Sequence, residues 1–314
     1  MLEFIIGRSG SGKTEQSLKE IVMAVEQDPL GKPIVFLTPA HLTYKIERKL
    51  AGMLEKNGKG FMRVQVYSFA RLARQVLLET GGGIYPRLSV IGKRLLLKKV
   101  SARRAKELKV FSKAVKRRGF SADLADCVKE LKGFGISPEY LGEKSAALAD
   151  GQLKEKVQDL AILYRDFSVQ MAGTYNDAED VLDALIKHIP DSGYLQGAEV
   201  WLDGFAYFNP QERAIITALL KTAARVHVSL QMDVYDDAAN SADTGLFHDA
   251  WEIEKILTEI AVREKHEVQR RMMPDLYRYK AEGIATIERD LFRPVPQKGE
   301  CSGVKIIEAA NQPT

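Results

Sequence analysis

The most constraining feature of the sequence is a glycine-rich loop close to its start. The loop reads Gly-Arg-Ser-Gly-Ser-Gly-Lys-Thr over residues 7–14. Glycines let such a loop curl its backbone N–H groups around phosphate oxygens at the start of a helix. The lysine then reaches the β- and γ-phosphates, and the threonine hydroxyl binds magnesium. The predicted nucleotide-binding residues are Gly7, Arg8, Ser9, Gly10, Ser11, Gly12, Lys13 and Thr14.

The surroundings of the loop favour a phosphate site over a chance glycine-rich turn. A short apolar run precedes it and predicts a buried strand, and apolar residues recur at helical spacing over residues 14–26. Further apolar runs alternate with helical segments along the chain. This alternation predicts βαβ units and a parallel sheet, and therefore an α/β fold. The expected strands cover residues 2–6, 33–37, 64–69, 200–203 and 226–230.

The chain changes character in its middle part. Residues 86–190 carry almost no strand signal and show helical periodicity, which predicts a helical insertion between strands of one sheet. Residues 234–295 look mainly helical and polar, and residues 304–309 predict a strand of a further domain that a truncated chain does not finish. The expected parts are a discontinuous P-loop domain of residues 1–85 and 195–235, a helical insertion of residues 86–194, a helical connecting segment of residues 236–300 and the start of a second domain at residues 301–314.

Composition excludes several classes of protein. The two cysteines, Cys127 and Cys301, lie far apart and the five histidines are scattered, so we expect no disulfide framework and no Cys or His metal site. A reducing cytoplasm fits this cysteine usage. No apolar run approaches the length of a membrane span, so we expect no membrane partner. The net charge of +4 does not by itself indicate a nucleic-acid partner.

A strongly basic stretch lies within the expected helical insertion. Between Lys93 and Arg118 there are twelve basic residues and one acidic residue, Glu107. Like charges at this density repel one another unless they meet an anion, and a duplex phosphate backbone is a natural partner. The alternative is a solvated surface helix. The candidate duplex contacts are Arg103, Arg104, Arg117 and Arg118.

Hydrolysis of a bound nucleotide needs more than the loop. An acidic pair at the end of a later strand should hold magnesium and position water. Asp203 follows the expected strand 200–203 and is a candidate for magnesium, but the next residue is Gly204, which has no carboxylate. A turn or helix-cap role for Asp203 stays open. We therefore assign no catalytic residue.

Four blocks of sequence, taken in chain order, resemble one family. The blocks are residues 4–14, 31–39, 66–73 and 202–212, the last reading Leu-Asp-Gly-Phe-Ala-Tyr-Phe-Asn-Pro-Gln-Glu. Together they resemble the AddB (RexB) subunits of bacterial ATP-dependent helicase–exonucleases. The resemblance implies a P-loop NTPase fold of the superfamily-1 helicase type, with a helical insertion domain. It implies ATP and Mg²⁺ as cofactors.

The sequence departs from active helicases of the UvrD type. Their second acidic motif reads D-E-x-Q-D, whereas residues 203–207 read Asp-Gly-Phe-Ala-Tyr. No Q-x-x-x-x-[FW]-R motif is recognisable after residues 228–233. The resemblance therefore implies a helicase fold that is kept for binding while hydrolysis is lost. We expect this chain alone to turn over little ATP and to have no nuclease activity.

The resemblance also implies where single-stranded DNA is bound. In helicases of this type the strand crosses the carboxyl ends of the parallel strands, and loops after the second and third strands contact it. Phe69 and Phe205 could stack on bases or could be ordinary core aromatics. The candidate single-strand contacts are His41, Thr43, Phe69, Arg71, Arg74 and Phe205.

The implied partners are single-stranded DNA, a duplex end and an AddA-type subunit that carries the motor. The implied complex resects broken ends for recombinational repair and reads a short regulatory (Chi-like) sequence. An iron–sulfur cluster is expected in the C-terminal nuclease part of such subunits, which this sequence lacks. Two alternatives stay open, a P-loop kinase acting on a small molecule and a DNA-binding scaffold with a vestigial P-loop.

Overall fold

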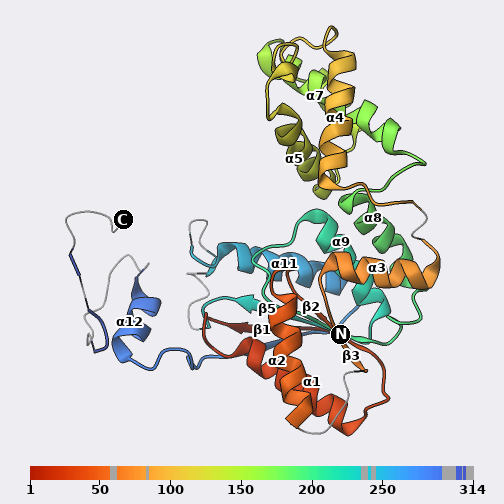
Figure 1. Cartoon of the computed structure of the whole chain (residues 1–314). Helices are drawn as coiled ribbons and strands as arrows, with labels where there is room; N and C mark the ends of the chain where they lie inside the picture. The colour runs from red at the N-terminus through yellow and green to blue at the C-terminus, as the bar shows by residue number, and fades with distance from the viewer. Residues whose placement is uncertain are drawn as a thin grey trace. The chain divides into compact units, whose positions relative to one another are not determined.

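A computed structural model describes residues 1–56, 62–82, 85–234, 240–241, 245–291, 302–305 and 307–308. The chain divides into two compact units, each with its own elements (Figure 1). The first, here called the sheet unit, comprises Met1–Val66, Glu199–Tyr207 and Ala224–Thr314. The second, the helical unit, comprises Tyr67–Ala198 and Phe208–Ala223. No helix within the described residues is long and apolar enough to cross a membrane.

A parallel sheet forms the centre of the sheet unit, in the order β3-β2-β4-β5-β1-β6. The loop strand β1 pairs with β5 on one side and with β6 on the other. The predicted α/β fold with a parallel sheet is confirmed, and each of the five expected strands is present. The strands are β1 (Leu2–Gly7), β2 (Ile34–Leu37), β3 (Val64–Tyr67), β4 (Glu199–Leu202), β5 (Arg225–Gln231) and β6 (Val268–Met272).

Two of the strand predictions need correction. The third strand ends at Tyr67 rather than residue 69, because the Ser68 side chain accepts a hydrogen bond from the Arg71 backbone and so caps a helix that begins at Phe69. Residues 268–272 lie in the segment expected to be mainly helical and polar, and they form β6. This strand lies at the sheet edge and exposes most of its side chains, so it lacks the apolar alternation that predicts a strand.

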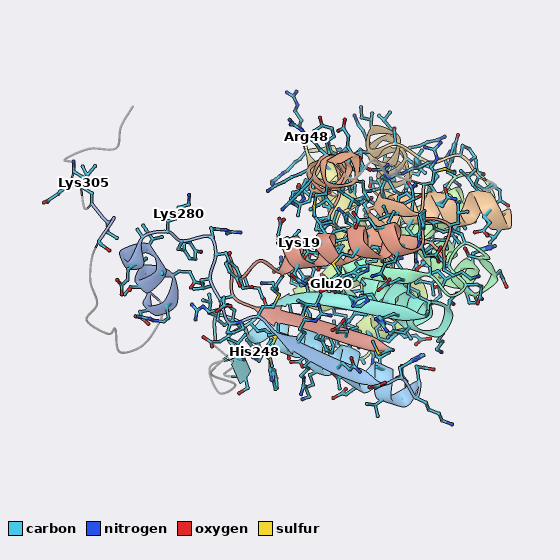
Figure 2. The ribbon with its side chains drawn as sticks, turned by 90° about the horizontal axis from the view of Figure 1, so that it is seen from below. Lys19, Glu20, Arg48, His248, Lys280 and Lys305 are labelled. Atoms are coloured by element: carbon cyan, nitrogen blue, oxygen red, sulfur yellow. The ribbon has the colours of Figure 1, made fainter. Side chains whose placement is uncertain are left out.

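Helices cover both faces of the sheet. Ile5, Phe36 and Trp201 point to the face where α1 and α2 supply apolar side chains such as Ile21 and Leu50. Figure 2 shows α1, which carries Lys19 and Glu20, lying along the sheet. α11 contacts β5 and β6. The helices of this unit are α1 (Lys13–Gln27), α2 (Thr43–Lys56), α11 (His248–Arg263) and α12 (Glu282–Asp290).

A charged cluster connects the first residues of three adjacent strands. The buried ring of His227 in β5 contacts a Glu3 carboxylate oxygen through Nδ1 at 2.6 Å and a Glu199 oxygen through Nε2 at 2.8 Å. The ring also stacks on Trp201 at 3.7 Å. Hydrogen bonding to His227 lowers the pKa of Glu3, although burial acts to raise it. This cluster lies at the end of the sheet opposite the glycine-rich loop.

The helical unit has its own core. Phe167, Leu163 and Leu97 are fully buried there, with Val128 from a neighbouring helix. α3 and α8 pack together, and α8 packs on α9, so the unit begins at Tyr67 and includes Phe208–Ala223. Its elements are α3 (Phe69–Thr80), α4 (Val90–Arg104), η1 (Ala114–Lys116), α5 (Phe120–Gly133), α6 (Pro138–Ala146), α7 (Gln152–Met171), α8 (Ala178–His188), η2 (Ile189–Asp191) and α9 (Pro210–Thr222).

The end of the chain differs from its prediction. Within residues 304–309, expected to form a strand, the structure describes Val304, Lys305, Ile307 and Glu308, and none of these four is in a strand. The other residues of that segment lie outside the described part of the chain. The sequence-based division into helicase-type domains stays a prediction.

Candidate nucleotide site

The glycine-rich loop joins the end of β1 to the start of α1. Gly10 and Gly12 have φ angles of 91° and 83°, a conformation that favours glycine. A Cβ on Gly10 would lie 2.8 Å from the Arg278 Cβ, and one on Gly7 would lie 2.7 Å from the Met273 carbonyl oxygen. The glycines are therefore required by both backbone conformation and close packing.

The loop opens onto a cavity of about 590 Å³ within the sheet unit. This volume lies in the range of small-molecule sites. The loop contributes one wall, and the segment after β4 contributes a second. Residues from the segment that follows β6 complete it. The lining residues are Ser9, Gly10, Gly12, Lys13, Thr14, Glu15, Lys49, Asp203, Gly204, Phe205, Ala206, Ser229, Gln231, Tyr277 and Arg278.

Thr14 and Asp203 meet in this cavity. The Thr14 hydroxyl donates a hydrogen bond of 2.6 Å to Asp203 Oδ2, although the two residues lie 189 positions apart in the chain. Asn209, not Asp203, caps the helix that follows β4, so the helix-cap alternative for Asp203 is wrong. Hydroxyl and carboxylate oxygens are the ligands that Mg²⁺ prefers. The pair therefore fits the donor set expected beside a nucleotide.

Lys13 is held by the loop that carries it. Its Nζ donates to the Gly7 carbonyl at 2.5 Å and to the Arg8 carbonyl at 3.0 Å. Burial lowers the pKa of this lysine to about 8, although the Asp203 charge opposes the shift. Ser11 Oγ is buried and has no hydrogen-bond partner among the described residues. Lys13 thus supplies a cation at the cavity, whereas Ser11 does not line it.

The Arg8 side chain does not line the cavity. It is buried and forms an ion pair with Asp233 at 2.7 Å and another with Glu288 at 3.2 Å. It also donates to the Glu288 carbonyl and lies over the Phe247 ring. Arg8 can therefore contribute only its backbone to a nucleotide site. Its side chain ties the loop to Asp233 and Glu288.

Several residues of the cavity were not predicted from the sequence, among them Tyr277, Arg278 and Lys49. The Tyr277 backbone N–H donates to the Gly10 carbonyl at 2.9 Å, and Arg278 donates to Ser9 Oγ at 3.0 Å. Both lie in a segment that carries no motif and was expected to be a helical connection. Lys49 belongs to α2 and pairs with Glu15. Its position on one face of a helix gave no signal for a role in the site.

The DNA-contact candidates of the sheet unit have different environments. His41 is exposed. The Thr43 hydroxyl is buried and donates to the Ala40 carbonyl at 3.0 Å, so it serves the start of α2. Phe205 is half-buried and lines the cavity of the glycine-rich loop. Phe205 is therefore not a core aromatic, and its nearest cavity is the candidate nucleotide site.

The candidates on α3 belong to the helical unit. Phe69 is only 6% exposed and packs edge-on against Phe208 at 6.5 Å. This favours the core alternative for Phe69 over base stacking. Arg71 is exposed and its guanidinium lies over the Tyr67 ring at 5.7 Å. Arg74 is exposed one helical turn further along.

The basic stretch is not one continuous helix. α4 ends at Arg104, and the chain continues through turns and η1 before α5. Arg104 pairs with Asp166 at 2.6 Å and with Glu107 at 2.8 Å, so it is held within the unit. The remaining candidates are exposed and form no ion pair within the described part of the chain. They are Arg103, Arg117 and Arg118.

Fold and site define an α/β protein with a parallel sheet whose glycine-rich loop and Asp203 line one cavity. The family model described as "ADDB, N-terminal" matches residues 4–288, and the chain belongs to this family. The resemblance inferred from the sequence is thereby confirmed.

Relatives named as B-type subunits of an ATP-dependent helicase/deoxyribonuclease match the chain over 99% of its length. The proteins from Desulforudis audaxviator, Pelotomaculum thermopropionicum and Geobacillus thermodenitrificans are 38%, 35% and 33% identical to it. The chain spans 27% of the length of each of these relatives.

The environment of Phe69 leads to a test of its role. Phe69→Ala should lower the free energy of unfolding by about 3–5 kcal/mol, because it removes a buried ring from the helical unit. Phe205→Ala is the matched control and should cost less, since Phe205 is only half-buried. Denaturant unfolding of both variants measures the difference. Unchanged stability of Phe69→Ala, together with weaker single-strand binding, would restore the base-stacking assignment.

Proposed function

We propose that this chain is the N-terminal nucleotide- and DNA-binding region of a helicase–deoxyribonuclease subunit that acts on broken DNA ends in recombinational repair. Membership of the family and the names of the relatives support the biological role. The observation that carries the nucleotide part is the Thr14–Asp203 contact inside the cavity of the glycine-rich loop. A superfamily-1 helicase-like fold is part of this proposal.

The proposed nucleotide is ATP with Mg²⁺. The backbone of the loop would hold the phosphates, with Lys13 supplying the cation. Thr14 and Asp203 would hold the metal, which when bound neutralises phosphate charge. Phe205 and Tyr277 also line the cavity and offer flat faces for the base. The same residues do not fit rapid hydrolysis, because Gly204 follows Asp203 where an acidic residue would position water.

The proposed DNA contacts fall into two groups. His41, Arg71 and Arg74 are exposed and follow the second and third strands, which suits contact with a single strand. Arg103, Arg117 and Arg118 are exposed and lack ion-pair partners among the described residues, which suits the phosphates of a duplex end. The same proposal includes an AddA-type partner, the reading of a regulatory sequence and an iron–sulfur cluster in the rest of the full-length protein.

The first test concerns the phosphate cation. Lys13→Ala should weaken ATP binding roughly 10- to 150-fold, which corresponds to losing a hydrogen bond to a charged group of about 1.5–3 kcal/mol. In the unchanged protein, ATP affinity should fall as pH rises through about 8, because Lys13 then loses its proton. Titration calorimetry at several pH values measures both effects. Lys19→Ala, on the exposed face of α1, is the control. Equal ATP affinity in Lys13→Ala would support the vestigial-loop alternative.

The second test concerns Gly204. Its φ of 83° and a Cβ position only 2.9 Å from Leu42 Cδ1 disfavour any side chain there. Gly204→Glu should therefore lose about 1–3 kcal/mol of stability without gaining ATP turnover. Gly204→Ala carries the same backbone strain without the carboxylate and is the matched control. DNA-stimulated ATP hydrolysis by Gly204→Glu, well above the rate of Gly204→Ala, would contradict this explanation of slow turnover.

The third test concerns the duplex contacts. Reversing the charges of Arg103, Arg117 and Arg118 should weaken duplex binding evenly across sequences and flatten the log–log salt slope by roughly 0.9 for each lost phosphate contact. Arg104→Gln should leave the slope unchanged, because Arg104 is occupied by Asp166 and Glu107. Fluorescence anisotropy over a salt series gives the slopes. An unchanged slope in the triple variant would show that these arginines are solvated surface residues that do not contact DNA.

A further inference from the structure

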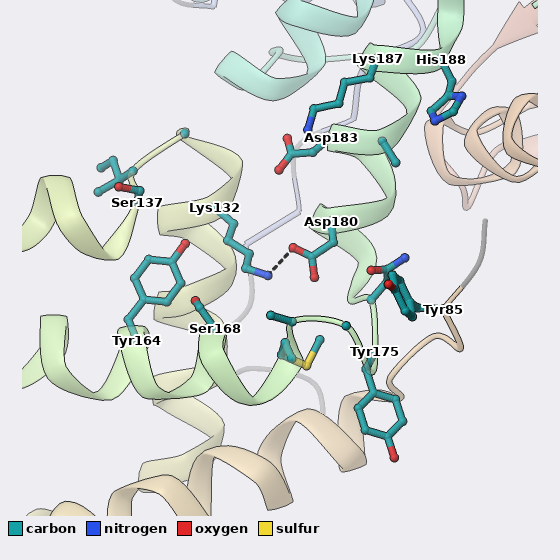
Figure 3. Close-up of a pocket in the computed structure, with 17 residues that line it drawn as sticks. Tyr85, Lys132, Ser137, Tyr164, Ser168, Tyr175, Asp180, Asp183, Lys187 and His188 are labelled. Atoms are coloured by element: carbon teal, nitrogen blue, oxygen red, sulfur yellow. Dashed lines mark hydrogen bonds and ion pairs between the residues drawn. The ribbon is translucent and has the colours of Figure 1, made fainter. Parts of the chain in front are cut away.

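A second cavity lies entirely within the helical unit, and none of the site residues predicted from the sequence lines it. It has a volume of about 550 Å³ and is lined by residues of α5, α7 and α8 and of the segments beside them (Figure 3). This volume is sufficient for a small organic ring system with its substituents. None of its lining residues belongs to the sheet unit, so it is separate from the candidate nucleotide site.

One buried side chain presents an unused polar group to this cavity. Tyr164 is only 3% exposed, and its ring belongs to the core cluster with Leu163 and Phe167. Figure 3 shows its hydroxyl directed away from the α7 backbone, toward the cavity. This hydroxyl has no hydrogen-bond partner among the described residues. Burial raises the pKa of Tyr164 to about 12, so the group remains a protonated donor. The hydroxyl lies at the open cavity, where it can donate a hydrogen bond to a ligand.

Two of the charged groups that line the cavity, Lys132 and Asp180, are paired with each other. Lys132 Nζ lies 2.8 Å from an Asp177 oxygen. It also lies 2.6 Å from an Asp180 oxygen, and this contact is drawn in Figure 3. Burial is the main cause that raises the pKa of Asp180. The lining carries both signs of charge, with Asp180 and Asp183 beside Lys132 and Lys187, so an ion of either sign would also meet a like charge. The arrangement therefore disfavours both a phosphate and a protein arginine, and favours a neutral polar ligand.

The remaining walls suit a flat ring. Met171 and Ile136 are apolar, and Tyr85 and Tyr175 add aromatic faces. Ser168 contributes a hydroxyl close to Tyr164 on the same helix. Apolar and aromatic walls beside a few fixed donors and acceptors are the way proteins hold unstacked nucleobases. Lys187 also lines the cavity, and Figure 3 shows its side chain directed toward Asp183.

We propose that this cavity of the helical unit binds one unpaired nucleobase of a DNA strand, with the Tyr164 hydroxyl hydrogen-bonded to the base edge. The site is additional to the proposed phosphate contacts and to the glycine-rich loop. It rests on the proposed DNA-binding role, and it depends on neither ATP nor magnesium. The cavity would hold the base because a base is uncharged and polar. The charged sugar–phosphate backbone of the strand would stay outside the cavity.

The test compares two probes and two proteins. The probes are a short mixed-sequence single strand and a base-free deoxyribose–phosphate strand of the same length. The proteins are the unchanged chain and Tyr164→Phe, which keeps the packed ring and removes only the hydroxyl. We expect Tyr164→Phe to bind the base-containing strand about 2- to 12-fold more weakly, as for the loss of one hydrogen bond, and to bind the base-free strand unchanged. Fluorescence anisotropy measures the four affinities.

Two further variants make the result decisive. Tyr140→Phe is the matched control, because Tyr140 is half exposed outside the cavity and should leave both affinities unchanged. Ala184→Phe fills the cavity from α8 and should reproduce the base-dependent loss if Tyr164→Phe is unstable. An equal loss for both strands, or no loss in a variant with normal melting, would overturn the base pocket. If the unchanged chain binds both strands equally, the base pocket is refuted and the proposed phosphate contacts stand. If it binds neither strand, the proposed DNA-binding function is refuted as well.

Discussion

The buried ion pair between Arg8 and Asp233 is the interaction on which the geometry of the glycine-rich loop depends. Arg8 is the second residue of the loop, and its guanidinium lies 2.7 Å from an Asp233 oxygen just beyond β5. The same guanidinium contacts Glu288 of α12 through both its carboxylate and its backbone carbonyl. Breaking a buried pair by removing one partner typically costs about 3–5 kcal/mol, so these segments are strongly tied together. Tyr277 and Arg278 lie between β6 and α12, which places them against the loop.

The opposite end of the sheet is fixed by charge as well. His227 lies between Glu3 of β1 and Glu199 of β4, so one ring links three adjacent strands at their amino ends. Arg271 of β6 contacts Glu3 from the other side and reaches Glu20 of α1. A shift of one residue in any of these strands would place the partner on the other face of the sheet. The register that aligns Thr14 with Asp203 is therefore held by polar contacts far from the cavity.

The sequence predicted the parts of the fold that follow from regular patterns. The apolar strands and the glycine-rich loop were recognisable because buried parallel strands and phosphate loops leave continuous, local signals. β6 was missed because an edge strand with exposed Gln269, Arg270 and Met272 has no such signal. The buried state of Phe69 and the ion pairs of Arg104 could not be predicted. The sequence does not show whether Phe69 stacks on a base or packs against Phe208. Nor does it show whether Arg104 binds a phosphate or pairs with Asp166.

Only those residues of the glycine-rich loop cavity that belong to recognisable sequence patterns were predicted. Lys13 and Thr14 follow from the motif, and Asp203 from its place after a strand. Tyr277 and Arg278 lie far along the chain from Gly10 and Ser9, and only the pairing of β6 with β1 brings them there. Long-range pairing of this kind depends on the tertiary fold and leaves no trace in the local sequence.

The state of Lys13 links the cavity to the segments that lie behind the loop. Its ammonium is bound to the Gly7 and Arg8 carbonyls, and burial already disfavours its charge. The ammonium has three N–H donors, so one remains for a phosphate beside the contacts to the Gly7 and Arg8 carbonyls. Under the proposed function, the phosphate would therefore be held by a lysine that also contacts the backbone of Arg8, whose side chain pairs with Asp233 and Glu288. Because Gly204 follows Asp203 where hydrolysis would need an acidic residue, the cavity suits nucleotide binding better than rapid turnover.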